Sequence, residues 1–441
     1  MPTIITRGNA TADGYGFGLL STGASGLIGE YILASAPSYS IMPFSNTGFI
    51  TTGTNTTASA YEIFNSSGSM TYYGNSTDSN TFAQSSKVDS SGNYYVAGIS
   101  GSYSPYAYIT KFNSSNSTVW NKSSTALYGG GASILPNSIA VDSSSNVFLC
   151  GGFNDGTTSY GFITKFNSSG TQQWQKSYYV GSATAFNNNQ LVLDTSSNVY
   201  IMGNQNSNVQ FIVAYNTSGT LLWSYVIAIT GTTLVNINNI GIDSSNNLYI
   251  SGIYKISGVS YPVLIKLNSS GTVQWCVQLA LSTTHSNLLN FGLAVDSSGN
   301  SYVTCSYNTT SNLNYIIKVD NTGSVVWART IMITSTYNYN GLILNAISID
   351  NKGSYYLTGQ IYPGASGFTP FFARLPTDGS KTGSQTFNSI TVAYLSTTVT
   401  ASAQAYSSTS TSPVGSGNIS FGSYGNSWSS ASTLTSYVSI F

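Results

Sequence analysis

The 441-residue sequence contains few charged residues, which make up 6% of the chain. About 25% is usual in globular domains. Thirteen basic and thirteen acidic side chains give a formal net charge of zero. Nucleic-acid binding by phosphate neutralisation needs clustered cations, so we expect no nucleic-acid partner. Because a chain with so little net charge associates readily, the composition favours a place within an assembly or on a surface.

Histidine and cysteine are almost absent. His285 is the only histidine, so a histidine-based metal site is excluded and a Ser–His pair has one candidate at most. Cys150, Cys276 and Cys305 form no Cys-x-x-Cys pair and are expected to be small buried hydrophobic side chains. Glycosidase chemistry needs two facing carboxylates, and none are paired by spacing outside the repeat described below. We therefore expect no metal, no cofactor and no catalytic residue.

Long apolar segments are also missing. No run approaches the roughly 20 residues that span a membrane, so membrane insertion is not expected. The N-terminal stretch MPTIITRGNATADGYGFG contains no uninterrupted apolar segment, and we therefore expect no conventional signal peptide.

The residues that replace charge, chiefly Asn, Ser, Thr, Gly and Tyr, occur in a repeat. The phrase VDSSGNYYVAG at 88–98 returns five more times, and its aspartates lie 49 to 54 residues apart. Tryptophans recur with the same spacing. A period of about 50 residues predicts a propeller or another repeat array. The two series are Asp89, Asp142, Asp194, Asp243, Asp296 and Asp350, and Trp120, Trp174, Trp223, Trp275 and Trp327.

Each repeat is predicted to contain four short strands. In one unit these are SIAVD, NVFLCGG, GFITKFN and TQQWQKSY, rich in β-branched and aromatic residues and bounded by Ser, Asn and Gly. With a degenerate copy at each end, the sequence predicts an all-β, seven-bladed β-propeller of four-stranded antiparallel blades over 39–390. Residues 1–38 form an N-terminal extension or attachment segment, and residues 391–441 a Ser/Thr/Gly-rich C-terminal β extension. We expect a strand from 25–36 or 388–397 to complete the outer edge of a terminal blade.

A polar turn such as NSSG, NTSG or DNTG joins the third and fourth strands, and the tryptophan lies four residues after it. This phrase resembles the bacterial seven-bladed propeller repeat of surface and secreted proteins. It also resembles the tryptophan-docking propeller of quinoprotein dehydrogenases, with Ser218, Gly219 and Trp223 matching its phrase. The resemblance implies blade architecture, and because the shared phrase is the structural one, it implies no quinone cofactor.

The repeat aspartates and the cations on the third strands are interpreted as structural. One carboxylate per turn suits the capping of turn amides, whereas calcium needs several clustered oxygens. The cations are expected to be solvated or locally paired. They are Lys111, Lys165, Lys266, Lys318 and Arg374.

Ligand binding is predicted on the face where the connections vary. The turns after the first and third strands are nearly uniform, whereas the other two connections vary and share the opposite face; variable loops on a rigid scaffold commonly bind ligands. Tyrosines with small polar residues make adaptable contact surfaces and suit sugars. The alternative is that they are ordinary soluble loop residues. The candidates are Tyr103, Tyr106, Tyr160, Tyr254, Tyr307, Tyr337 and Tyr339.

The N-terminal stretch quoted above resembles the starts of virion proteins from environmental bacteriophages. We therefore predict a non-enzymatic structural protein on a virion surface, displayed for host attachment through glycans or for particle decoration. The alternative is a prokaryotic cell-surface or secreted adhesin of the same fold, and a weaker one is a carbohydrate-active enzyme. The expected partners are other virion proteins or further copies, contacted through the terminal extensions, and a host-surface glycan.

Overall fold

The fold is all-β. Every regular element in the described part of the chain is a strand, so no helix there is long and apolar enough to cross a membrane. The computed structural model describes residues 16–19, 40–44, 48–54, 59–65, 70–76, 81–100, 106–125, 133–154, 159–178, 186–205, 209–229, 233–283, 285, 288–307, 313–334, 339–350, 353–363, 369–387, 390–404, 406–410, 420–423, 428–430 and 438–440.

The described strands form seven antiparallel sheets, here numbered in chain order. The first three are built on β2 (Ser40–Phe44), β3 (Gly48–Thr54), β4 (Ser59–Asn65) and β5 (Met70–Ser76); β6 (Thr81–Val88), β7 (Tyr94–Ser100), β8 (Tyr106–Phe112) and β9 (Thr118–Thr125); and β10 (Ser133–Val141), β11 (Val147–Asn154), β12 (Ser159–Phe166) and β13 (Gln172–Tyr178). The fourth and fifth are built on β14 (Phe186–Leu193), β15 (Val199–Gln205), β16 (Val209–Tyr215) and β17 (Leu221–Ile229), and on β18 (Thr233–Ile242), β19 (Leu248–Ile256), β20 (Val259–Leu267) and β21 (Val273–Leu281).

The last two sheets depart from this plan. The sixth is built on β22 (Leu288–Val295), β23 (Ser301–Tyr307), β24 (Asn314–Val319) and β25 (Val325–Ile333) and carries two further strands. The seventh contains β26 (Tyr339–Ile349), β27 (Ser354–Pro363) and β28 (Thr369–Pro376), and β1 (Gly16–Leu19), from near the start of the chain, pairs with β28 as the fourth strand.

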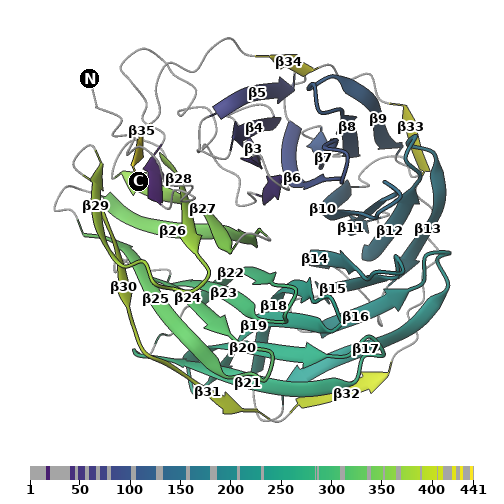
Figure 1. The fold of residues 1–441 in the computed structure, drawn as a ribbon. Helices are drawn as coiled ribbons and strands as arrows, with labels where there is room; N and C mark the ends of the chain where they lie inside the picture. Colours follow the sequence, from purple (N-terminus) through teal and green to yellow (C-terminus); the bar gives the residue numbers. More distant parts are fainter. Residues whose placement is uncertain are drawn as a thin grey trace.

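The sheets surround a common centre. The first strands of the seven sheets contact one another in the cyclic order β2, β6, β10, β14, β18, β22, β26 and back to β2. Figure 1 shows these strands innermost and the fourth strands, such as β9, β13 and β17, at the periphery. None of the described sheets closes on itself.

The hydrophobic core lies between neighbouring sheets. The middle strands are buried almost throughout, as in β11, where Val147, Leu149 and Phe153 pack against Tyr95 and Ile109 of the second sheet. β-branched and aromatic residues suit strands buried on both faces. The predicted all-β, antiparallel character is therefore confirmed.

The strand that completes the seventh sheet is not the predicted one. The segment 390–396 is β30 (Ile390–Ser396), which pairs with β25 in the sixth sheet, and residues 25–36 lie outside the described part of the chain. β29 (Gly383–Phe387), which follows β28 in the chain, pairs with β30 and not with β28. The physical reason is proximity, because β29 and β30 are separated by two residues and a short hairpin loop costs little entropy. The outer edge of β28 is therefore available for pairing with β1.

The C-terminal strands pair with the sheets described above. Figure 1 shows their strands around the periphery. The division at residue 390 stays a prediction, but these strands, here called the tail strands, belong to the same sheets as the repeat. They are β30 on β25, β31 (Val399–Ala403) on β21, β32 (Tyr406–Ser410) on β17, β33 (Ser420–Ser423) on β9, β34 (Trp428–Ser430) on β5 and β35 (Val438–Ile440) on β1.

Candidate functional site

Each repeat aspartate holds the turn after the first strand of its sheet. The Asp142 Oδ1 atom accepts hydrogen bonds from the amides of Ser144 (2.9 Å) and Asn146 (2.8 Å), and Oδ2 accepts one from the Asn146 side chain (2.8 Å). Three equivalent bonds hold the turns at Asp89, Asp194, Asp243 and Asp296, and Asp350 accepts from the Ser354 amide and the Tyr356 hydroxyl. These carboxylates are therefore occupied by structural bonds.

Asp89 also joins two sheets. Its Oδ2 atom accepts hydrogen bonds from the Tyr95 hydroxyl and from the Ser145 hydroxyl of the next sheet, both at 3.0 Å. Burial raises the pKa of Asp89, but the bonds from Asn93, Tyr95 and Ser145 outweigh burial and hold that pKa below its ordinary value. The ionised carboxylate is thus the form that the fold stabilises.

The repeat tryptophans dock each sheet onto the next. Trp120 Nε1 donates to the Ser168 carbonyl oxygen (3.1 Å), and Lys111 Nζ donates to the same oxygen (3.3 Å) while lying over the Tyr95 ring. Ser168 belongs to the polar turn of the third sheet, and a Cβ atom on Gly170 of that turn would lie 2.8 Å from the Trp120 ring. The turn therefore needs glycine for close approach. The same indole–carbonyl bond follows from Trp174 to Thr217, Trp223 to Ser269, Trp275 to Asn321 and Trp327 to Thr377.

The candidate ligand tyrosines are distributed differently from the prediction. Tyr160 and Tyr254 lie within strands β12 and β19 and are buried, with Tyr160 stacked on Phe153 at 4.8 Å between ring centroids. This corrects the expectation that they are loop residues open to a ligand. Both strands are middle strands that are buried almost throughout, so their side chains lie in the core on either face. Tyr106 is half-buried at the start of β8. Tyr339 starts β26, and Tyr103 and Tyr337 lie outside the described residues.

Tyr307 lies in a cluster that also includes His285. The Tyr307 ring lies 4.5 Å from the His285 ring, and the Tyr315 ring lies 5.7 Å from it in an edge-on arrangement. His285 Nε2 is 2.8 Å from the Thr283 hydroxyl and 3.1 Å from the Tyr315 hydroxyl, and these two hydroxyls are 3.0 Å apart. The three polar atoms thus form a closed hydrogen-bonded triangle.

Two neighbouring sheets position this cluster. Thr283 and His285 follow β21 of the fifth sheet, Tyr307 ends β23 and Tyr315 lies in β24 of the sixth. The His285 carbonyl oxygen accepts a hydrogen bond from the Ser260 amide of β20 (2.6 Å), which fixes the connection. All these segments lie at the variable-connection face, opposite the polar turns.

The cluster is neutral in character. Burial lowers the pKa of His285 below its ordinary value, because the charged imidazolium is poorly solvated there. Nearby in the fifth sheet, Tyr254 donates to the Gln278 side chain, and burial raises its pKa to about 12. Thr283 is exposed and Tyr307 half-buried, so the cluster reaches the surface at these two residues.

This arrangement offers hydroxyl, imidazole and aromatic groups rather than charge. Such groups suit hydrogen bonding to, and stacking on, neutral polar ligands. No set of three or more potential metal ligands occurs within the described ranges, and the three cysteines there are buried, as predicted.

Sequence reasoning predicted Tyr307 but missed Thr283 and Tyr315, and it considered His285 only as a nucleophile's partner. Tyr315 has the sequence context of an ordinary third-strand residue, so its place gives no signal. The uniqueness of His285 was the available signal, combined with its place in a variable connection.

Comparisons with known proteins give no family. No family model matches the sequence, and no curated protein matches it. The solved structure of the polysaccharide lyase Uly1 is similar over 83% of this chain and 98% of its own, with a TM-score of 0.47 and 9% identity. A protein of unknown function from Dyadobacter fermentans DSM 18053 is similar over 79% and 98%, with a TM-score of 0.43 and 8% identity. The tail fiber of Staphylococcus aureus phage P68 is similar over 56% and 51%, with a TM-score of 0.28 and 14% identity.

Proposed function

We propose that the seven sheets are the blades of a seven-bladed β-propeller, and that the protein is a non-enzymatic virion surface protein that attaches to a host-surface glycan. The observation that carries the binding role is the cluster of Thr283, His285, Tyr307 and Tyr315 at the variable-connection face. Aromatic faces beside hydroxyl donors match the alternating apolar and hydroxyl surfaces of a sugar ring.

Binding is favoured over catalysis because the repeat aspartates are engaged elsewhere. The repeat carboxylates hold turns, and burial lowers the pKa of His285. Hydrolysis of glycosidic bonds commonly uses two carboxyl groups, and among the residues that the structure describes no carboxyl group hydrogen-bonds to the atoms of the His285 triangle.

A place on a virion is supported by zero net charge and by the covering of sheet edges. Exposed strand edges pair with other chains, and the tail strands cover the outer edge of six of the seven sheets among the described residues. Because a tail strand is the outermost strand in five of the seven described sheets, a lateral partner meets these strands first. We therefore propose that other virion proteins or further copies contact the terminal extensions.

A glycan array with purified protein tests the binding role. Tyr307→Ala removes a half-buried ring from the cluster, whereas Val326→Ala removes an exposed side chain at the opposite, polar-turn end. We expect glycan binding by the wild type and by Val326→Ala, and at least a tenfold loss with Tyr307→Ala, about 1.4 kcal/mol. Absence of binding to any glycan, or equal binding by both variants, contradicts the proposal.

Two alternatives have their own tests. Capsid and tail genes beside the coding sequence are expected, and secretion genes there indicate a cell-surface or secreted adhesin of the same fold. A carbohydrate-active enzyme is the weaker alternative, and the His285 triangle is its candidate for proton transfer in the described part of the chain. Products released from polysaccharides by the wild type and not by His285→Ala establish the enzyme.

A further inference from the structure

The tail strands pair with the sheets in a constant register. Their last residues, Ser396, Ala403, Ser410, Ser423 and Ser430, lie opposite Arg329, Val277, Tyr225, Lys122 and Gly74. In four of these sheets the partner lies two residues after the docking tryptophan, and in the first sheet it lies two residues after Tyr72, which holds the equivalent position. Five of the six tail strands therefore end at the same reference point on their sheets.

This register gives the tail a period of seven residues. Ser396, Ala403 and Ser410 are seven residues apart, and so are Ser423 and Ser430. The step from Ser410 to Ser423 is 13 residues and passes the third sheet, from the fourth to the second. At about 3.3 Å per residue, seven extended residues span at most about 23 Å, which sets the separation of neighbouring outer strands that one step can bridge.

An apolar residue recurs with the same period. Val392, Val399 and Tyr406 pair with Ile333, Leu281 and Ile229, which are the last residues of their outer strands. Val392 and Val399 are buried in the cores on either side of the sixth sheet, whereas Leu395 and Thr400 are exposed. The first three tail strands thus each place an apolar residue opposite the last residue of the outer strand that they pair with.

The order of the tail is opposite to the order of the repeat. It visits the sixth, fifth, fourth, second, first and seventh sheets in turn, and β35 ends on β1, the strand from near the start of the chain. Figure 1 shows these strands along the rim of the ring. A strand that crosses from sheet to sheet resists separation of each pair of neighbours that it joins.

We propose that the outer edges of the sheets form one strand-binding surface, which takes an extended peptide whose short strands follow one another every seven residues, with apolar anchors at the sixth, fifth and fourth sheets. The C-terminal segment is its ligand and holds the ring closed from outside. Affinity comes from main-chain pairing, as in other added strands, and specificity comes from the spacing of the anchors. Any partner strand that replaces the tail must have the same period.

Repetition makes this binding multivalent. Each step alone pairs three to five residues with its sheet and binds weakly, because one short added strand recovers few hydrogen bonds. Once the first step is bound, the next binds at the high effective concentration set by a short connection. The affinity of a correctly spaced segment then exceeds the affinity of a single step by roughly 10²- to 10⁴-fold. A wrongly spaced segment loses this gain.

The test uses the full chain with a protease site inserted between β29 and β30 and cut after folding. The cut protein is incubated, in guanidinium chloride too dilute to unfold the ring, with a fluorescent peptide of residues 390–441. A control peptide lacks one residue in each connection, which keeps the composition and breaks the period. We expect the native peptide to replace the tail, with the control at least a hundredfold weaker.

Variants at the anchor positions of the peptide distinguish binding that depends on the anchors from nonspecific binding. Val399→Ser should weaken replacement roughly tenfold, about 1.4 kcal/mol, because it puts a polar side chain at a buried apolar position. Thr400→Ser, at the exposed neighbouring position, should leave it unchanged. Equal replacement by the native and control peptides overturns the proposal, and so does tail release that occurs only together with unfolding of the ring.

Discussion

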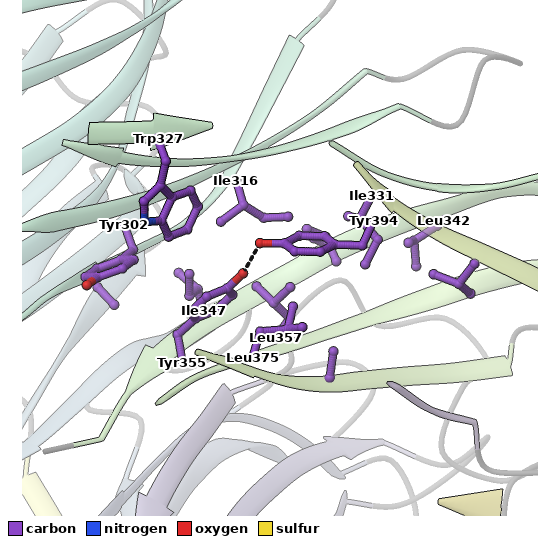
Figure 2. Close-up of a cluster of buried hydrophobic side chains, with 14 of the residues drawn as sticks. Tyr302, Ile316, Trp327, Ile331, Leu342, Ile347, Tyr355, Leu357, Leu375 and Tyr394 are labelled. Carbon is purple, nitrogen blue, oxygen red and sulfur yellow. Dashed lines mark hydrogen bonds between the residues drawn. The ribbon is translucent and has the colours of Figure 1, made fainter. Parts of the chain in front are cut away.

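A hydrogen bond between two tyrosines tests how firmly the tail is built into the core. Tyr355 of β27 in the seventh sheet and Tyr394 of β30 on the sixth meet through their hydroxyl groups, as Figure 2 shows. Both are buried, at 0% and 1% exposure. Burial raises the pKa of Tyr394 to about 12 and that of Tyr355 well above its ordinary value, so the pair stays protonated in neutral solution.

The two single substitutions are expected to differ. Tyr394→Phe leaves the Tyr355 hydroxyl buried without its hydrogen-bond partner, and an unpaired buried polar group costs about 1–3 kcal/mol. Tyr355→Phe costs about 1 kcal/mol or less, since Tyr394 keeps other interactions. The double variant removes both hydroxyls and should lie close to the wild type.

The rate of unfolding in guanidinium chloride is the appropriate measurement, because large chains often unfold irreversibly. At about 1.4 kcal/mol per factor of ten, Tyr394→Phe should unfold roughly 5- to 100-fold faster if the contact is lost at the transition state. The double variant should recover most of this loss, which gives a coupling free energy of about 1 kcal/mol or more. Additive effects of the two substitutions would refute the contact between tail and seventh sheet.

Four further outcomes are expected. Gly219→Ala, at φ +78° with its new Cβ atom 2.9 Å from the Trp174 ring, should lower the thermal midpoint more than Gly258→Ala, which has φ +83° and open space and should cost only about 1–2 kcal/mol. Trp327→Ala should destabilise by about 3–5 kcal/mol in denaturant titrations, and exposed Val326→Ala by under about 0.5 kcal/mol. The depressed pKa of Asp89 gives stability that is present above the unfolded pKa of about 3.9 and lost as pH falls through the folded one, so Asp89→Asn should flatten the acid limb of a melting-temperature curve. The lowered pKa of His285 should give a loss of stability that begins below about pH 6.5, absent in His285→Gln.

The repeating part of the fold was predictable because its signals are local. The spacing of Asp142 and Trp174 marks the turn after β10 and the outer strand β13, and the strands between them alternate or are uniformly apolar. Such patterns depend on hydrogen bonds within one turn and on side chains within one strand. The prediction of all-β antiparallel structure therefore needed no knowledge of the third dimension.

The candidate site was only partly predictable because it joins residues from different sheets. Tyr307 was included for its place in a variable connection, but Tyr254 and Tyr160 look the same in sequence and are buried. What distinguishes Tyr307 is contact with His285, from the neighbouring sheet. Nothing local in the sequence specifies which connections meet across that boundary.

The tail shows a different limit of local reasoning. The sequence predicted a C-terminal β extension, but it expected the terminal extensions to contact other virion proteins or further copies. Strands as short as β33 and β34 make few hydrogen bonds and have little core of their own, so they are stable only on an existing edge. The seven-residue period is the signal that identifies that edge, since it matches the step between sheets rather than any property of the tail itself. A weak repeat of this kind can be recognised once the arrangement of the sheet edges that it pairs with is known.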